Sequence, residues 1–141
     1  MKINSGELEA RKKLLNQILT NCELCPRKCH VNRVQGELGY CRSGKEMVIS
    51  SIFPHFGEEK ELVGEFGSGT IFFTNCNLGC LYCQNYEISH LGEGRRIKKE
   101  ELAEGMLYLQ RIGCHNINFV SPTHFVPQIV EALQCAIEQG L

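Results

Sequence analysis

Short apolar runs alternate with helical periodicities along the second half of the chain. Residues 70–73 are β-branched and aromatic and lie between glycines, which is typical of a buried strand of a parallel sheet. A helical period covers residues 98–112 and ends at Gly113. Residues 117–121 predict a second strand, and Pro127 lies near the start of a second helix. The order strand, helix, strand, helix predicts a parallel pair with a right-handed crossover, the repeat of a (β/α) barrel.

Both predicted helices are amphipathic, so each is expected to bury one face. In the first helix, the expected inward positions are Leu102, Ala103, Met106, Leu107 and Leu109. In the second helix, they are Ile129, Val130, Leu133, Ala136 and Ile137.

The first half of the chain divides by pattern into three stretches. Residues 1–20 predict a packing helix with no visible chemistry. Residues 21–44 are rich in cysteine and in turn-forming glycine and proline, with little apolar material. Residues 45–66 predict a connector with a short strand-like alternation before a turn at Pro54. Residues 67–141 then hold the α/β unit.

Composition narrows the class of protein. The chain has 141 residues, 43% of them hydrophobic, and a formal net charge of −1, which predicts one soluble domain with no preference for nucleic acid. No apolar stretch reaches the length of a membrane span and no secretion signal is visible, so we expect a cytoplasmic protein without a membrane partner. Nine cysteines in such a chain favour metal-binding thiols over a disulfide scaffold.

Three of the cysteines follow the first predicted strand directly. Cys76, Cys80 and Cys83 have Cys-x3-Cys-x2-Cys spacing and would lie on the loop at the carboxyl end of that strand, where α/β folds place their chemistry. Three thiolates on one loop suit an iron–sulfur cluster of the cubane type and would leave one iron with open coordination positions. The alternatives are a zinc site, which would need a fourth ligand nearby, or disulfides.

With Tyr82 directly before the last cysteine, the motif resembles the signature of the radical S-adenosylmethionine (radical SAM) superfamily. The surrounding residues are similar to pyruvate formate-lyase activating enzyme-like proteins. The resemblance implies a 4Fe-4S cluster on these cysteines, S-adenosylmethionine bound to the open iron, and reductive cleavage to a 5'-deoxyadenosyl radical. It also implies reduced flavodoxin or ferredoxin as electron donor and a glycyl-radical protein as partner.

Two further site residues follow from the resemblance. Tyr82 would pack or hydrogen-bond near the adenine. The family has a Gly-Gly-Glu-like turn after the second strand, where this chain has Ser121-Pro122-Thr123-His124. Thr123 is therefore the candidate acceptor for the amino group of S-adenosylmethionine, and His124 is either a helix cap or a proton carrier.

A second group of cysteines precedes the connector, with Cys22, Cys25, Cys29 and Cys41 at Cys-x2-Cys-x3-Cys-x11-Cys spacing. Four thiolates would close a metal knuckle that this apolar-poor stretch needs in order to fold. The resembling subfamily has a similar Cys-x-Leu-Cys-Pro-Arg-x-x-Cys segment. The metal is either zinc or a second iron–sulfur cluster, because spacing alone does not separate them.

The barrel of the superfamily has more βα units than the pattern predicts here. The resemblance therefore implies the amino-terminal portion of a partial (β/α) barrel of the radical SAM type. An edge strand would be left unpaired, and a carboxy-terminal complement chain is a candidate partner. The alternative is a non-catalytic iron–sulfur or zinc-binding remnant, or a subunit of a split enzyme.

Overall fold

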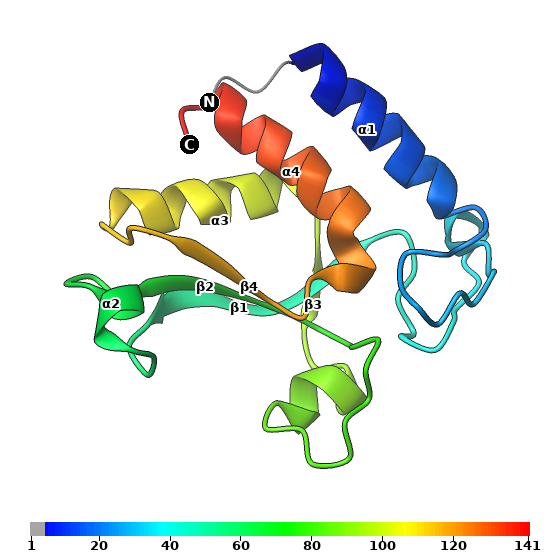
Figure 1. Ribbon diagram of the computed structural model, residues 1–141, viewed down its shortest axis with the longest axis horizontal. Helices are drawn as coiled ribbons and strands as arrows, with labels where there is room; N and C mark the ends of the chain where they lie inside the picture. Colours follow the sequence, from blue (N-terminus) through cyan, green and yellow to red (C-terminus); the bar gives the residue numbers. More distant parts are fainter. Residues whose placement is uncertain (1–4) are drawn as a thin grey trace.

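A computed structural model describes residues 5–141 and shows helices packed beside a small sheet (Figure 1). The helices are α1 (Ser5–Ile18), α2 (Lys60–Val63), α3 (Lys99–Arg111) and α4 (Val126–Glu138). The strands are β1 (Met47–His55), β2 (Ser68–Phe73), β3 (Arg95–Ile97) and β4 (Ile117–Val120). Short helical turns are η1 (Arg33–Gln35), the π-helical η2 (Glu87–Leu91) and η3 (Thr123–Phe125). None of the helices in this part of the chain is long and apolar enough to cross a membrane.

The sheet has the strand order β3-β1-β2-β4 and mixes both strand directions. β2 and β4 are parallel, with Gly69 opposite Ile117 and Phe72 opposite Val120. α3 lies between them in the chain, so the predicted strand, helix, strand unit is confirmed. β1 is antiparallel to both β2 and β3. The fold is therefore α/β with a mixed sheet, whereas the partial barrel remains a prediction.

β1 lies at the centre of this sheet, although its sequence predicted only a short strand before a turn. The predicted turn at Pro54 is wrong, because Pro54 lies within β1 opposite Gly69. Proline cannot donate a ladder hydrogen bond and is tolerated where one side of a strand is unpaired. β3 pairs with β1 only at Met47, Val48 and Ile49, so the β3 side of β1 is open at Pro54.

α3 and α4 lie on one face of the sheet and pack against each other (Figure 1). Every inward position predicted for α3 is buried. In α4, Ile129 and Ala136 are buried and Val130 and Leu133 half-buried, but Ile137 is 36% exposed and its inward assignment is wrong. The centre of the core consists of Met47, Ile49, Ile71, Phe73, Leu102, Ala103, Met106, Leu109, Phe125, Ile129, Ala132 and Ala136.

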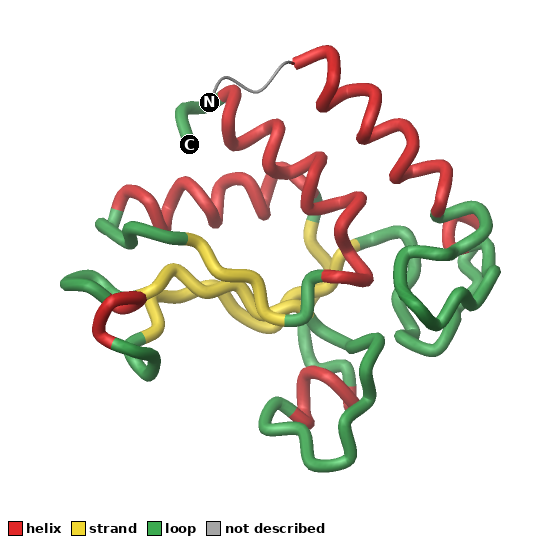
Figure 2. Tube along the Cα trace, viewed as in Figure 1, coloured by secondary structure: helices red, strands yellow, loops and turns green. Residues whose placement is uncertain are grey.

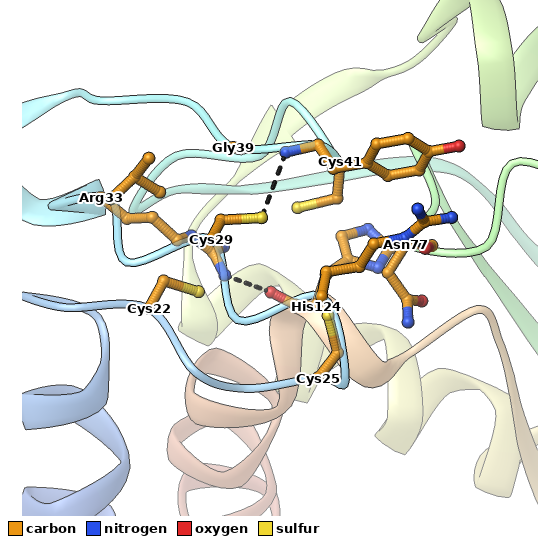
Figure 3. A pocket seen from close by; sticks show the side chains of 11 residues that line it. Cys22, Cys25, Cys29, Arg33, Gly39, Cys41, Asn77 and His124 are labelled. Atoms are coloured by element: carbon orange, nitrogen blue, oxygen red, sulfur yellow. Dashed lines mark hydrogen bonds between the residues drawn. The ribbon is translucent and has the colours of Figure 1, made fainter.

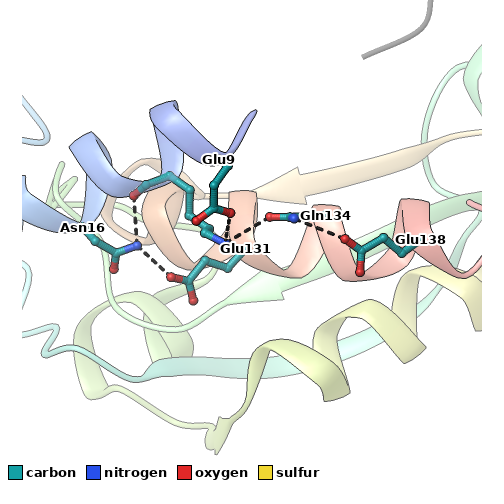
Figure 4. Close-up of polar contacts among 6 residues, drawn as sticks. Glu9, Asn16, Glu131, Gln134 and Glu138 are labelled. Carbon is teal, nitrogen blue, oxygen red and sulfur yellow. Dashed lines mark hydrogen bonds and ion pairs between the residues drawn. The ribbon is translucent and has the colours of Figure 1, made fainter. Parts of the chain in front are cut away.

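α1 contacts α4 through polar side chains (Figure 4). Lys12 Nζ donates to Gln134 Oε1 at 3.2 Å, and Asn16 Nδ2 donates to Glu131 Oε1 at 2.7 Å. Lys12 also forms an ion pair with Glu9 on its own helix. These contacts fix the end of α1 beside α4, and so fix where the cysteine-rich stretch begins.

Candidate functional site

The cluster loop, residues 74–94, leaves the carboxyl end of β2 and returns to the sheet at β3 (Figure 2). Its base is closed by backbone hydrogen bonds, from Thr74 N to Val48 O at 2.9 Å and from Asn75 N to Ile88 O at 2.8 Å. Asn75 has φ 68°, a left-handed conformation that asparagine tolerates better than most residues. The three cysteines of this loop therefore follow the carboxyl end of a strand that is paired in parallel.

Two of the three thiols on the cluster loop already accept hydrogen bonds. Cys76 and Cys83 are half-buried, and Cys80 is exposed. Leu78 N donates to Cys76 Sγ at 3.3 Å, and Ser89 Oγ donates to Cys83 Sγ at 3.2 Å. Hydrogen bonds to sulfur stabilise the thiolate ligands of iron–sulfur clusters and tune their potential. This donor set fits a cluster that keeps one accessible iron.

The two positions predicted to bind S-adenosylmethionine lie beyond the carboxyl ends of β2 and β4. Tyr82 is 95% exposed on the cluster loop, and Thr123 is half-buried at the start of η3. Because these two strands are parallel, their carboxyl ends lie at the same edge of the sheet, where open α/β sheets bind ligands. Contacts from Tyr82 and Thr123 to S-adenosylmethionine remain predictions.

The four cysteines of the knuckle, residues 21–44, line one cavity (Figure 3). These are Cys22, Cys25, Cys29 and Cys41. The cavity volume is about 10 Å³, and Tyr40 N donates to Cys29 Sγ at 3.4 Å. The structure thus brings together the thiols that the spacing grouped, while their metal ligation remains a prediction.

His124 lines the same cavity, a position that sequence reasoning missed (Figure 3). The side chain is only 2% exposed, and Nε2 lies 2.9 Å from Thr74 O. A carbonyl oxygen can only accept, so Nε2 carries the hydrogen and Nδ1 of the neutral ring presents a lone pair. Nδ1 is buried and has no hydrogen-bond partner within residues 5–141.

The environment of His124 does not favour either of the roles that the sequence suggested for it. Burial lowers the pKa of His124 to about 4; the bond to Thr74 opposes this shift and the charge of Arg33 adds to it. The ring is therefore neutral at neutral pH, whereas a proton carrier works best with a pKa near the ambient pH. The helix-cap interpretation is also wrong, because the ring bonds to Thr74 and no side chain caps α4.

Arginines of the knuckle hold the cluster loop at both of its ends. Arg27 Nε donates to Asn77 O at 3.0 Å, and Arg27 Nη2 donates to Leu78 O at 2.9 Å. Arg42 Nη2 donates to the carbonyl oxygens of Ser89 and His90 in η2. The two cysteine groups are therefore parts of one substructure, although they are far apart in sequence.

An aromatic contact completes this junction between the knuckle and the cluster loop. The Arg27 guanidinium lies 3.5 Å from the centre of the Tyr40 ring. Gly79 of the cluster loop has φ 69°, and a Cβ there would overlap the Tyr40 hydroxyl. A larger residue at Gly79 would therefore meet both backbone strain and the Tyr40 side chain.

In neither cysteine group do the observed side-chain positions suit the binding of a single ion. Within residues 5–141, no three Cys, His, Asp or Glu side chains converge on one point at ion-binding distance. A cysteine sulfur moves by rotation about χ1 without any change in the backbone. Metal binding at either group thus requires rotation of side chains.

The cluster loop lies within a part of the chain that matches a known protein family. The chain is 35% identical over 134 residues to the uncharacterized protein MJ0674 of Methanocaldococcus jannaschii, an alignment that covers 89% of this chain and 38% of the relative. No solved structure matches the chain significantly. Residues 70–140 match the model of the radical SAM superfamily, from β2 through the cysteines to α4. Because this match spans half of the sequence, the chain belongs to the radical SAM superfamily.

Proposed function

We propose that this chain binds a 4Fe-4S cluster through Cys76, Cys80 and Cys83 and serves in the reductive cleavage of S-adenosylmethionine. Membership of the superfamily carries the proposal, because the family match includes the whole cysteine motif. When bound, the cluster delivers one electron to the sulfonium of S-adenosylmethionine, and the products are methionine and a 5'-deoxyadenosyl radical.

The residues around the motif have roles that suit this chemistry. The backbone of Leu78 and the hydroxyl of Ser89 stabilise negative charge on two of the thiolates. Thr123 would accept a hydrogen bond from the ammonium group of S-adenosylmethionine. Tyr82 projects from the loop and is free to cover the adenine.

The proposal is tested by measuring cleavage of S-adenosylmethionine. Protein reconstituted anaerobically with iron and sulfide is mixed with S-adenosylmethionine and dithionite, and 5'-deoxyadenosine is measured by chromatography. We expect a small amount of 5'-deoxyadenosine that depends on the reductant, because residues 5–141 provide only part of the proposed nucleoside site. Iron-loaded protein that forms none, and whose electron paramagnetic resonance signal S-adenosylmethionine does not change, would favour the non-catalytic iron–sulfur or zinc-binding alternative.

Exposed apolar side chains on the cluster loop support a macromolecular partner. Leu78, Leu81 and Tyr82 are 65%, 92% and 95% exposed, and apolar groups clustered on a surface commonly mark interaction sites. An electron donor such as reduced flavodoxin or ferredoxin must approach this loop. A glycyl-radical protein, the partner that the activating-enzyme resemblance implies, would approach the same surface.

A further proposal concerns the number of βα units in the complete enzyme. The chain spans 38% of the length of the curated relative that it matches. β4 is the edge strand of the sheet among the described residues, and its outer side offers unpaired backbone groups. We propose that further βα units add in parallel at β4 and complete the nucleoside site.

Loss of the Arg27 side chain is expected to loosen the cluster. Arg27→Met removes both hydrogen bonds to the carbonyl oxygens of Asn77 and Leu78. If the closed loop is weakened by about 1 kcal/mol, iron should pass to a chelator about fivefold faster. Anaerobic chelation of the reconstituted protein, followed by absorbance, measures this rate.

Arg11→Met is the matched control, because Arg11 is an exposed arginine of α1 whose only ion pair within residues 5–141 is with Glu7. The free energy of unfolding of both variants should stay within about 1 kcal/mol of that of the parent. Equal iron release from the two variants would show that Arg27 does not hold the loop.

A further inference from the structure

The knuckle cavity has a fifth donor that its cysteine spacing does not reveal. Besides four thiols, the cavity is lined by His124, which comes from η3 far along the chain (Figure 3). The ring is almost fully buried, and its Nδ1 has no partner in the described part of the chain. A buried acceptor left unpaired costs about 1–3 kcal/mol, so Nδ1 of a residue that lines this cavity calls for a partner.

The hydrogen bond made by Nε2 indicates which kind of partner would suit Nδ1 of His124. Nε2 donates to the carbonyl oxygen of Thr74 at 2.9 Å. A metal-bound histidine almost always donates its second ring N–H to a carbonyl, a carboxylate or water, which fixes the tautomer and the ring orientation. His124 therefore already has the tautomer and the outer hydrogen bond of a metal ligand that binds through Nδ1.

The size of the cavity favours one of the candidate metals. Its volume is about 10 Å³, which is room for about one water-sized atom. A cubane cluster has four irons and four sulfides and would have to push the walls apart. A mixed set of thiolate and imidazole ligands is typical of a single zinc ion with four ligands.

The backbone of the knuckle is consistent with a fold held by a metal. Lys28, His30 and Arg42 have φ between 41° and 56°, in the left-handed region that costs non-glycine residues about 1 kcal/mol each. Cys22 is the only buried apolar side chain of residues 21–44. With so little apolar burial, ligand bonds to an ion would offset this backbone cost.

We propose that the knuckle is a structural zinc site in which Nδ1 of His124 and three of the four thiolates of Cys22, Cys25, Cys29 and Cys41 bind one ion. The sulfurs converge by rotation about χ1, and the imidazole stays in place. The site is distinct from the proposed cluster on Cys76, Cys80 and Cys83 and does not depend on the chemistry proposed there.

This arrangement would connect zinc to the cluster loop. Thr74 accepts the hydrogen bond from His124 and lies two positions before Cys76. Zinc that fixes the ring would also fix the carbonyl from which the loop departs. The two metal sites would then be structurally coupled, although the zinc itself has no open position for substrate.

The first test is made on the 141-residue chain without substitution. After expression with added zinc, metal analysis should find about one zinc ion per chain. X-ray absorption at the zinc edge should show three sulfurs at about 2.3 Å and one nitrogen at about 2.0–2.1 Å. A chain that takes up no zinc, a shell of four sulfurs, or iron in place of zinc at the knuckle would each overturn the proposal.

Variants test the ligand assignment separately. In His124→Gln the side-chain amide can still donate to Thr74 O, but no donor atom remains at Nδ1. Its zinc affinity should fall by at least about 100-fold, the upper end of the effect of losing an outer-shell partner. His115→Gln, at an exposed histidine after α3, should bind zinc like the parent.

Single cysteine-to-serine variants at the four knuckle positions complete the experiment. Three should lose zinc and one should retain it. Loss of zinc in all four, together with parental affinity in His124→Gln, would establish a four-thiolate site and refute the role of His124. Circular dichroism of each variant at saturating zinc separates loss of a ligand from loss of the fold.

Discussion

Replacing Cys76, Cys80 and Cys83 together by alanine is expected to remove about four iron ions per chain from the reconstituted protein. The reason is that no other thiol is available on the cluster loop, so the cluster would have no protein ligands left. Formation of 5'-deoxyadenosine should fall to the level of a protein-free control. Iron and sulfide analysis, with electron paramagnetic resonance of the reduced sample, measures the loss.

Cys135→Ser provides the matched control, because Cys135 is half-buried in α4, outside both cysteine groups. It should keep its iron. Without metal, the free energy of unfolding of the triple variant should stay within about 1 kcal/mol of that of the parent, since none of the three replaced cysteines is buried in the core. Undiminished iron in the triple variant would refute the ligand assignment, and loss of zinc would contradict the assignment of the two cysteine groups to distinct metal sites.

The strand, helix, strand, helix unit could be predicted because its signals are local. The apolar period of α3 and the glycine after it place the helix within two residues of its observed bounds, Lys99–Arg111. The pattern also gives the parallel pairing of β2 and β4, since a helical crossover brings two strands side by side in the same direction. Such inferences need only the periodicity of neighbouring residues.

The antiparallel part of the sheet was harder to predict, because its strands carry weak local signals. β3 has only three residues, two of them exposed arginines, so it shows no alternation. Gly94 is the residue in this region whose type reflects the fold, because a Cβ there would lie 2.6 Å from Ile49 O. A glycine at such a close approach indicates a crossing of backbones, but the sequence does not say which segment is crossed.

The junction between the two cysteine groups was not predictable for a related reason. Arg27 and Arg42 donate to backbone carbonyl oxygens, and a carbonyl is present at every residue, so no sequence pattern identifies the partner. Cysteine spacing predicted which thiols gather at the knuckle. The spacing could not predict that His124 lines the same cavity. His124 follows the carboxyl end of β4, and it reaches the cavity because the fold brings η3 against the knuckle.

Removing the guanidinium of Arg33 is expected to destabilise the whole amino-terminal half. Arg33 is 1% exposed, and no carboxylate within residues 5–141 pairs with it. It donates instead to Gly44 O, at 3.0 Å from Nε and 2.6 Å from Nη2, and to His124 O at 2.7 Å from Nη1. One buried side chain therefore joins the start of η1, the end of the knuckle and η3.

In Arg33→Met, most of the volume remains but both carbonyl oxygens lose their donors. A buried carbonyl left unpaired, as His124 O would be, costs about 1–3 kcal/mol, and half-buried Gly44 O costs less, so the free energy of unfolding should fall by about 3 kcal/mol. Arg33→Lys should lose less, because its ammonium can still reach one of the two carbonyls. Urea unfolding followed by circular dichroism, with and without zinc, measures both values.

The control for Arg33 is Arg111→Met, at an exposed arginine in the last turn of α3, which should change the free energy of unfolding by less than about 0.5 kcal/mol. Zinc should bind more weakly to Arg33→Met than to this control, because the backbone of His124 is no longer held against the knuckle. If Arg33→Met has the same free energy of unfolding as Arg111→Met, the two carbonyl oxygens find other donors, and Arg33 does not hold the knuckle on η3.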